Sequence, residues 1–90
     1  GCTLVSYRGW DCSGDAANAW VFTPSGCRSC EPFDDCHSFF LSGNCPRGHL
    51  VASDSGCSAW FGSSDNVNFG GTGCWNVNTG HNWVSGYPCF

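Results

Sequence analysis

Nine cysteines in a chain of 90 residues constrain this sequence more than any other feature. A cysteine content of one residue in ten is typical of small secreted domains, which are too short to bury a large apolar core and are held together by disulfides. We therefore expect one extracellular domain over residues 1–90. Because the chain has no methionine, we also expect Gly1 to be a mature N-terminus left after removal of a signal sequence.

The number of cysteines is odd, so four disulfides would leave one cysteine unpaired or bonded to another chain. A monomer and a disulfide-linked homodimer therefore both remain open. The connectivity is open as well, since nine cysteines with one left out can be paired in roughly 945 ways. The cysteines concerned are Cys2, Cys12, Cys27, Cys30, Cys36, Cys45, Cys57, Cys74 and Cys89.

The chain contains two similar halves. Leu4-Val5 and Leu50-Val51 each precede a polar turn and a Cys-Ser pair, and the same blocks recur in the same order. This order predicts an internal duplication of about 1–45 and 46–90, although chance similarity is the alternative because Cys, Ser and Gly are common here. Duplication would make Cys12 equivalent to Cys57, Cys27 to Cys74, and Cys45 to Cys89. It leaves three extra cysteines, among which we expect the unpaired one: Cys2, Cys30 and Cys36.

Short runs of β-branched and aromatic residues, bounded by turn-forming residues, predict an all-β fold. Eight such runs at a spacing of about ten residues favour a β-sandwich or barrel. The one helical candidate, Asp15–Ala19, is too short to form a stable helix. The predicted strands are Thr3–Tyr7, Ala19–Thr23, Phe39–Leu41, His49–Ala52, Ala59–Gly62, Asn66–Phe69, Cys74–Val77 and Asn82–Ser85.

Two β units of about 45 residues resemble the βγ-crystallin domain, in which each unit is a Greek key. Tyr7 and Gly14 fit the aromatic and glycine that open such a motif, with Cys12 in the place of its second aromatic. The stretch Phe33-Asp34-Asp35-Cys36-His37-Ser38-Phe39 resembles the family's closing stretch, with Phe33 for Trp and Phe39 for the last Ser. The chain is also similar in pattern to fungal small secreted cysteine-rich proteins, including killer-toxin-like members with crystallin folds. This resemblance implies a small disulfide-rich sandwich of two Greek keys.

The two halves can be aligned at their ends in two ways. Counted from Cys27 and Cys74, Ser38 matches Ser85. Counted from the closing cysteines, Ser42 matches Ser85 instead. The sequence leaves both alignments open.

The closing stretch carries the candidate metal site, which the resemblance identifies as a calcium site. Its ligands would be Asp34, Asp35 and Ser38, because calcium takes six to eight hard oxygen ligands. The alternative is a solvated turn in which the aspartates accept hydrogen bonds from backbone N–H groups. Cys27 and Cys30 have the spacing of a zinc pair, but in a secreted chain this spacing favours disulfides. We expect no other cofactor.

Aromatic and asparagine side chains form a candidate ligand-binding surface. Rings stack on the apolar faces of sugars and amides bind hydroxyls, so exposed Trp10, Trp60 and Trp83 would suit a glycan. The segments 66–70 and 76–80 both read Asn-Val-Asn-x-Gly. In a strand, their asparagines would project to one face and valine to the other, as a ladder that contacts a ligand or only solvent. The ladder consists of Asn66, Asn68, Asn76 and Asn78.

Charge and motif content narrow the function. A net charge of −4 with three arginines and no lysine argues against nucleic acid and anionic membranes as partners. No apolar run approaches the roughly 18 residues of a membrane span, and no Gly-x-Ser-x-Gly elbow is present. We therefore expect a secreted, non-enzymatic interaction protein: an effector or killer-toxin-like antimicrobial polypeptide that binds a cell-surface protein or glycan of a host or competitor. The alternatives are a lectin-like carbohydrate-binding module and, in another class, a small hydrolase.

Overall fold

The structure is a computed structural model that describes residues 1–57, 64–78, 80 and 83–90. In this part of the chain the regular elements are eight β-strands. No helix there is long and apolar enough to cross a bilayer. The strands are β1 (Cys2–Tyr7), β2 (Ala16–Phe22), β3 (Glu31–Cys36), β4 (Ser38–Gly43), β5 (Gly48–Ser53), β6 (Asp65–Phe69), β7 (Gly73–Asn76) and β8 (Trp83–Cys89).

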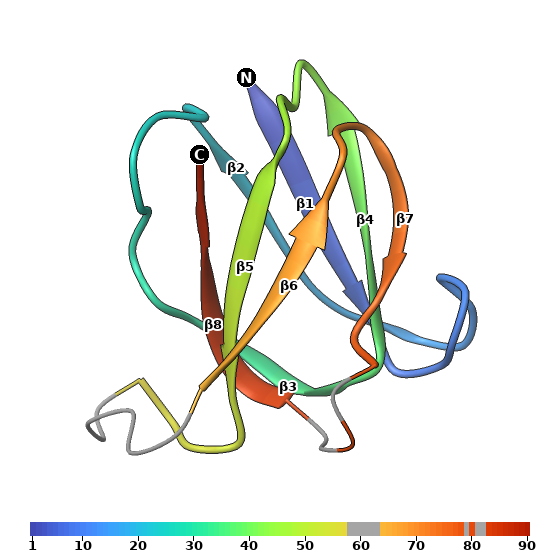
Figure 1. Cartoon of the computed structure of the whole chain (residues 1–90). Helices are drawn as coiled ribbons and strands as arrows, with labels where there is room; N and C mark the ends of the chain where they lie inside the picture. Colours follow the sequence, from blue (N-terminus) through green and yellow to red (C-terminus); the bar gives the residue numbers. More distant parts are fainter. Residues whose placement is uncertain (58–63, 79, 81–82) are drawn as a thin grey trace.

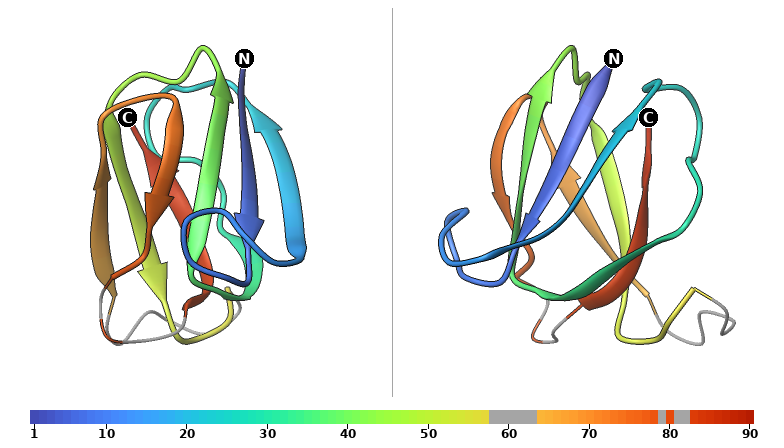
Figure 2. Two further views of the ribbon diagram at one scale, coloured as in Figure 1. Left: turned by 90° about the vertical axis from the view of Figure 1, so that its right-hand side faces the viewer. Right: turned by 180° about the vertical axis from the view of Figure 1, so that it is seen from behind.

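The strands form two four-stranded antiparallel sheets that pack face to face (Figure 1). The first sheet has the order β2-β1-β4-β7, and the left view of Figure 2 looks onto it. The second sheet has the order β3-β8-β5-β6. The predicted small, disulfide-rich, all-β sandwich is therefore confirmed.

Alternation along the strands places the core between the sheets. In β1, Cys2 and Leu4 are buried while Thr3 and Val5 are only half-buried. The core is mainly aromatic and aliphatic, because side chains that point inward from both sheets must be removed from water together. Its largest fully buried members are Trp83, Phe33, Phe39, Leu4, Leu41, Leu50 and Val77.

The two halves of the chain contribute to the sheets in the same way. The first half contributes β1, β2 and β4 to the first sheet, and its remaining strand, β3, forms an edge of the second sheet. The second half contributes β5, β6 and β8 to the second sheet, and its remaining strand, β7, forms an edge of the first. The registers also correspond, because Ser38 pairs with Tyr7 on β1 and Ser85 pairs with Ser53 on β5. This pairing favours the alignment in which Ser38 matches Ser85. The duplication of about 1–45 and 46–90 stays a prediction about how the halves are related.

Four disulfides connect the loops to the sheets. Two of them occupy corresponding places in the two halves. Cys12, in the loop after β1, is bonded to Cys74 on β7. Cys57, in the loop after β5, is bonded to Cys30, which directly precedes β3. The other two are Cys2–Cys45 and Cys27–Cys89. Four disulfides are consistent with an extracellular protein.

The remaining cysteine, Cys36, is a free thiol with no exposed surface. The prediction that the unpaired cysteine lies among Cys2, Cys30 and Cys36 is confirmed. Its burial argues against the disulfide-linked homodimer, because a second chain could reach the thiol only if the core opened.

Three strands differ from the predictions. The strand predicted at Ala19–Thr23 begins earlier, at Ala16, because pairing with β1 extends it through most of Asp15–Ala19, the segment rejected as a helix. The strand β3 was not predicted, since its sequence Glu-Pro-Phe-Asp-Asp-Cys resembles an acidic turn. The last strand begins at Trp83 and continues to Cys89, beyond the predicted end at Ser85. The predicted strand Ala59–Gly62 lies outside the described residues.

Candidate functional site

Asp34 and Asp35 lie together on an irregular part of β3. Their φ angles are 59° and 66°, in the left-handed region, and regular pairing of β3 with β8 is interrupted between Pro32 and Cys36. Asp34 already has a partner, since its carboxylate accepts a hydrogen bond from Arg8 Nη2 at 2.7 Å. A second bond, from Arg8 Nη1 to the Asp34 carbonyl oxygen, is 2.8 Å long. Hydrogen bonding to Asp34 and the charge of its carboxylate raise the pKa of Arg8.

Ser38 has a structural role in this arrangement. Its hydroxyl accepts a hydrogen bond from Cys12 N at 2.8 Å and donates one to Gly9 O at 2.6 Å. Ser38 is fully buried and fastens the loop of residues 8–15 to the outer face of the first sheet. The structure thus places Asp34 and Asp35 side by side but Ser38 beneath a loop. Within residues 1–57, 64–78, 80 and 83–90, no group of three or more His, Cys, Asp or Glu side chains could hold a metal ion.

The predicted tryptophan surface needs a correction. Trp83 is 1% exposed and cannot stack on an external sugar, so its assignment as an exposed ligand-binding residue is wrong. Its ring lies 3.9 Å from that of Phe33 between centroids, because the start of β8 turns this large apolar side chain into the core. Trp10 is 48% exposed and its ring lies 5.0 Å from that of His37. Trp60 lies outside the described residues.

The predicted asparagine ladder is divided between two sheets. Asn66 and Asn68 are exposed on β6 with Val67 buried between them, and Asn76 is exposed beside buried Val77, as the alternation predicted. However, Asn66 and Asn68 lie on β6 of the second sheet and Asn76 on β7 of the first, so the four asparagines are not a ladder on the face of one sheet.

Asn76 and Asn78 differ from the asparagines of β6 in their surroundings. The Asn76 amide is engaged with Asp11, accepting from its backbone N–H and donating to its carboxylate, both at 2.8 Å. Asn78 is exposed and lies beyond the end of β7. Both amide atoms of Asn76 are therefore already used inside the protein.

A groove brings Asn68 together with residues that the sequence pattern did not single out. We call it the Trp75 groove; it lies where the β6 edge of one sheet meets the β7 edge of the other, and its volume is about 530 Å³. This volume falls within the roughly 300–1,000 Å³ typical of small-molecule sites. The groove is lined by Arg47, Gly48, His49, Asn68, Phe69, Gly70 and Trp75.

The backbone fixes the half-buried aromatic ring in the Trp75 groove. The indole Nε1 of Trp75 donates a hydrogen bond to Gly71 O at 2.9 Å. A Cβ atom on Gly70 would come within 3.3 Å of the Trp75 ring, so the small residue allows the ring to lie against the chain. A ring held in this way loses little conformational freedom when a ligand binds.

Three polar side chains line the groove together with this ring. His49 and Asn68 are cross-strand neighbours on β5 and β6, and exposed Arg47 precedes β5. The groove therefore combines an aromatic surface, an amide, an imidazole and a guanidinium. Sequence reasoning noted the asparagine but missed Arg47, His49 and Trp75, because strand pairing and the meeting of two sheet edges bring them together. No protein-family model, curated protein or solved structure matches the chain.

Proposed function

We propose that this protein is a secreted, non-enzymatic interaction protein that acts on a host or competitor cell surface and recognises a glycan there. The observation that supports the proposal is the Trp75 groove, in which a fixed indole lies beside the side chains of Asn68, His49 and Arg47. Aromatic rings stack on the apolar faces of sugars, while amide, imidazole and guanidinium groups exchange hydrogen bonds with hydroxyls and acidic substituents. The four disulfides suit a protein that works outside the cell.

The effector or killer-toxin-like part of the proposal rests on the resemblance to fungal secreted proteins with a βγ-crystallin fold. The two similar halves, each contributing four strands to the sandwich, are consistent with that resemblance in fold. A rigid sandwich of this kind would present the groove without a conformational change. Binding would then require little ordering of the protein.

A glycan array tests the groove, with Asn66 as an internal reference. Asn66 and Asn68 are both exposed on the same face of β6, but only Asn68 lines the groove. We expect Asn68→Ala to weaken binding by about 1 kcal/mol, a roughly fivefold rise in Kd, because one hydrogen bond to the sugar is lost. Asn66→Ala should bind like the wild type. An array without hits, or equal losses in the two variants, would contradict the glycan proposal.

A cell assay tests the biological part separately. Purified protein is added to a panel of fungal, bacterial and plant cells, and growth and viability are followed. We expect inhibition or death in at least one cell type, and reduced potency for Asn68→Ala but not Asn66→Ala. Glycan binding without any cellular effect would contradict the effector or toxin hypothesis and would favour the hypothesis of a lectin-like module.

A further inference from the structure

The strand β2 is an unprotected edge of the first sheet. It is the terminal strand of that sheet and pairs with β1. Edge strands are commonly protected from further pairing by charged residues or proline, and the sequence Ala-Ala-Asn-Ala-Trp-Val-Phe has neither. Val21 is 78% exposed on this edge. The edge therefore has the features of a strand that can accept another.

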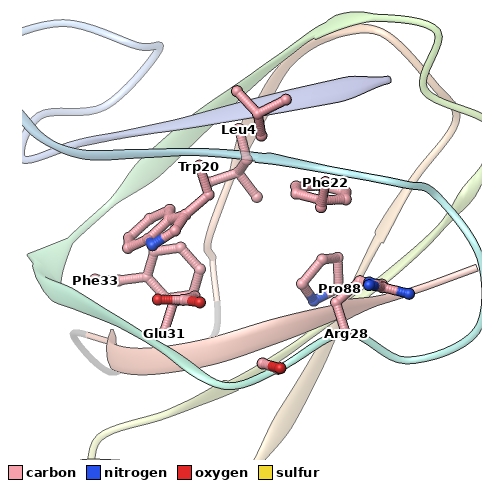
Figure 3. A pocket seen from close by; sticks show the side chains of 9 residues that line it. Leu4, Trp20, Phe22, Arg28, Glu31, Phe33 and Pro88 are labelled. Atoms are coloured by element: carbon pink, nitrogen blue, oxygen red, sulfur yellow. The ribbon is translucent and has the colours of Figure 1, made fainter.

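A pocket of about 190 Å³, here called the β2–β3 pocket, opens beside this edge (Figure 3). It lies between β2, at the edge of the first sheet, and β3, at the edge of the second. The Trp20 ring meets that of Phe33 edge-on, with 4.8 Å between centroids. A hydrogen bond of 2.8 Å from Asn18 Nδ2 to Pro32 O joins the two strands near one end. The apolar lining comes from Leu4, Trp20, Val21, Phe22, Phe33 and Pro88.

Two opposite charges lie among the lining residues of the β2–β3 pocket. Arg28 lies in the segment that leads into β3 and Glu31 is the first residue of β3, both across the pocket from β2 (Figure 3). Arg28 donates a hydrogen bond to Ser25 O at 3.1 Å, which leaves most of its donors unused. Arg28 and Glu31 do not form an ion pair with each other, because the ion pair found in the described part of the chain joins Arg8 to Asp34. Both charges can therefore interact with a ligand.

We propose that an extended peptide segment of a partner protein adds to β2 as a fifth strand and places one large apolar side chain in the β2–β3 pocket. Successive side chains of a strand point to opposite faces, so every second residue of an added strand would point between the sheets. Main-chain hydrogen bonds supply affinity in this mode of recognition, and pockets for alternate side chains supply specificity. A cavity of roughly 150 Å³ can hold a benzene ring, so the pocket suits one phenylalanine or leucine side chain.

The charges of the pocket define the rest of the ligand. The inward side chains on either side of the apolar one are two residues away from it, or about 7 Å along the strand. An acidic residue on one side would meet Arg28, and a basic residue on the other would meet Glu31. The recognised pattern is therefore acidic-x-apolar-x-basic, or its reverse, depending on strand direction. This site lies at the opposite edge of the sandwich from the Trp75 groove and is independent of it.

Blocked heptapeptides titrated into the full protein test this proposal by isothermal calorimetry. The probes carry Asp-Thr-Phe-Thr-Lys, the reversed order Lys-Thr-Phe-Thr-Asp, or alanine in place of phenylalanine. We expect one charge order to bind at least tenfold more tightly than the alanine peptide, with the preferred order reporting the strand direction. N-methylation of the peptide amides that face β2 should abolish binding, whereas N-methylation of the opposite amides should not.

Variants of the protein locate the site. Arg28→Glu should weaken binding of the preferred peptide at least fivefold, and Arg47→Glu, the same charge change in the Trp75 groove, should leave binding unchanged. Equal binding of the phenylalanine and alanine peptides, or no effect of N-methylation on either edge, would overturn the proposal. Concentration-dependent dimerisation that Val21→Lys abolishes would also overturn it, because β2 would then pair with a second copy. None of these results depends on glycan binding.

Discussion

Replacing Ser38 by alanine should destabilise the protein more than any other serine substitution on β4. The change removes a fully buried hydroxyl that accepts from Cys12 N and donates to Gly9 O. Each hydrogen bond contributes about 0.5–1.5 kcal/mol, and the buried groups left without a partner move the cost toward the upper end. We therefore expect a loss of about 2–3 kcal/mol, which lowers the Tm of a domain of this size by about 10–20 °C.

Urea unfolding with the disulfides intact measures this loss. The titrations should be made at pH 5–6, where the Cys36 thiol is protonated and disulfide exchange is slow. Ser42→Ala is the matched control: Ser42 also lies on β4, and its hydroxyl has no hydrogen bond to the described residues. Its loss should stay below about 0.5 kcal/mol.

The equivalent serine of the second half extends the test. The Ser85 hydroxyl donates one hydrogen bond, to Ser55 O, so Ser85→Ala should cost about 1 kcal/mol. The expected order of losses is therefore Ser38→Ala, then Ser85→Ala, then Ser42→Ala. A Ser38→Ala variant no less stable than Ser42→Ala would refute the argument that the hydroxyl fastens the 8–15 loop.

Three further predictions concern the cysteines and calcium. Burial raises the pKa of the Cys36 thiol above its ordinary value of 9.0. The folded state therefore favours the protonated thiol: the stability that this supplies is fully present below pH 9.0 and is lost as the pH rises through the raised pKa. Iodoacetamide should consequently leave the native protein unmodified but alkylate it in urea, and Cys36→Ala should show a weaker fall in stability at high pH; rapid native alkylation would contradict this. Replacing Cys12 and Cys74 together by serine should cost about 4 kcal/mol, since the disulfide spans a sequence separation of 62 residues, and an unchanged urea midpoint would contradict this. Because Arg8 holds Asp34 and Ser38 is buried, we expect millimolar calcium to leave Tm unchanged; a rise that Asp35→Asn abolishes would instead show a calcium site.

The sequence predicted strands well where alternation was clear and poorly where local chemistry competed with pairing. Thr3–Tyr7 and Asn66–Phe69 alternate and were found almost as predicted. In β3, Pro32 and two aspartates give the sequence of a turn, yet Phe33 and Cys36 are buried because the segment closes the edge of the second sheet. A local pattern does not contain that tertiary requirement.

The candidate site was harder to predict because it depends on which sheet each strand joins. The near-repeat of Asn66–Gly70 and Asn76–Gly80 predicted a common face, but the exchange of β7 places Asn76 in the first sheet, whereas Asn66 and Asn68 belong to the second. The same exchange brings Trp75 beside Asn68 and creates the groove. Residue types thus indicated glycan chemistry, while only the strand order could show which residues share a surface.

The position of the unpaired Cys36 in β3 gives a physical reason for an odd number of cysteines. With Ser38 matched to Ser85, Cys36 occupies the position that Trp83 holds in the second half, and the two residues are also direct partners between β3 and β8. Both are fully buried, and the Trp83 ring already contacts Phe33 in the space between the sheets. A second large aromatic at this contact would overpack the core, whereas a cysteine acts as a small apolar residue. The volume available beside Trp83 therefore accounts for a cysteine at position 36.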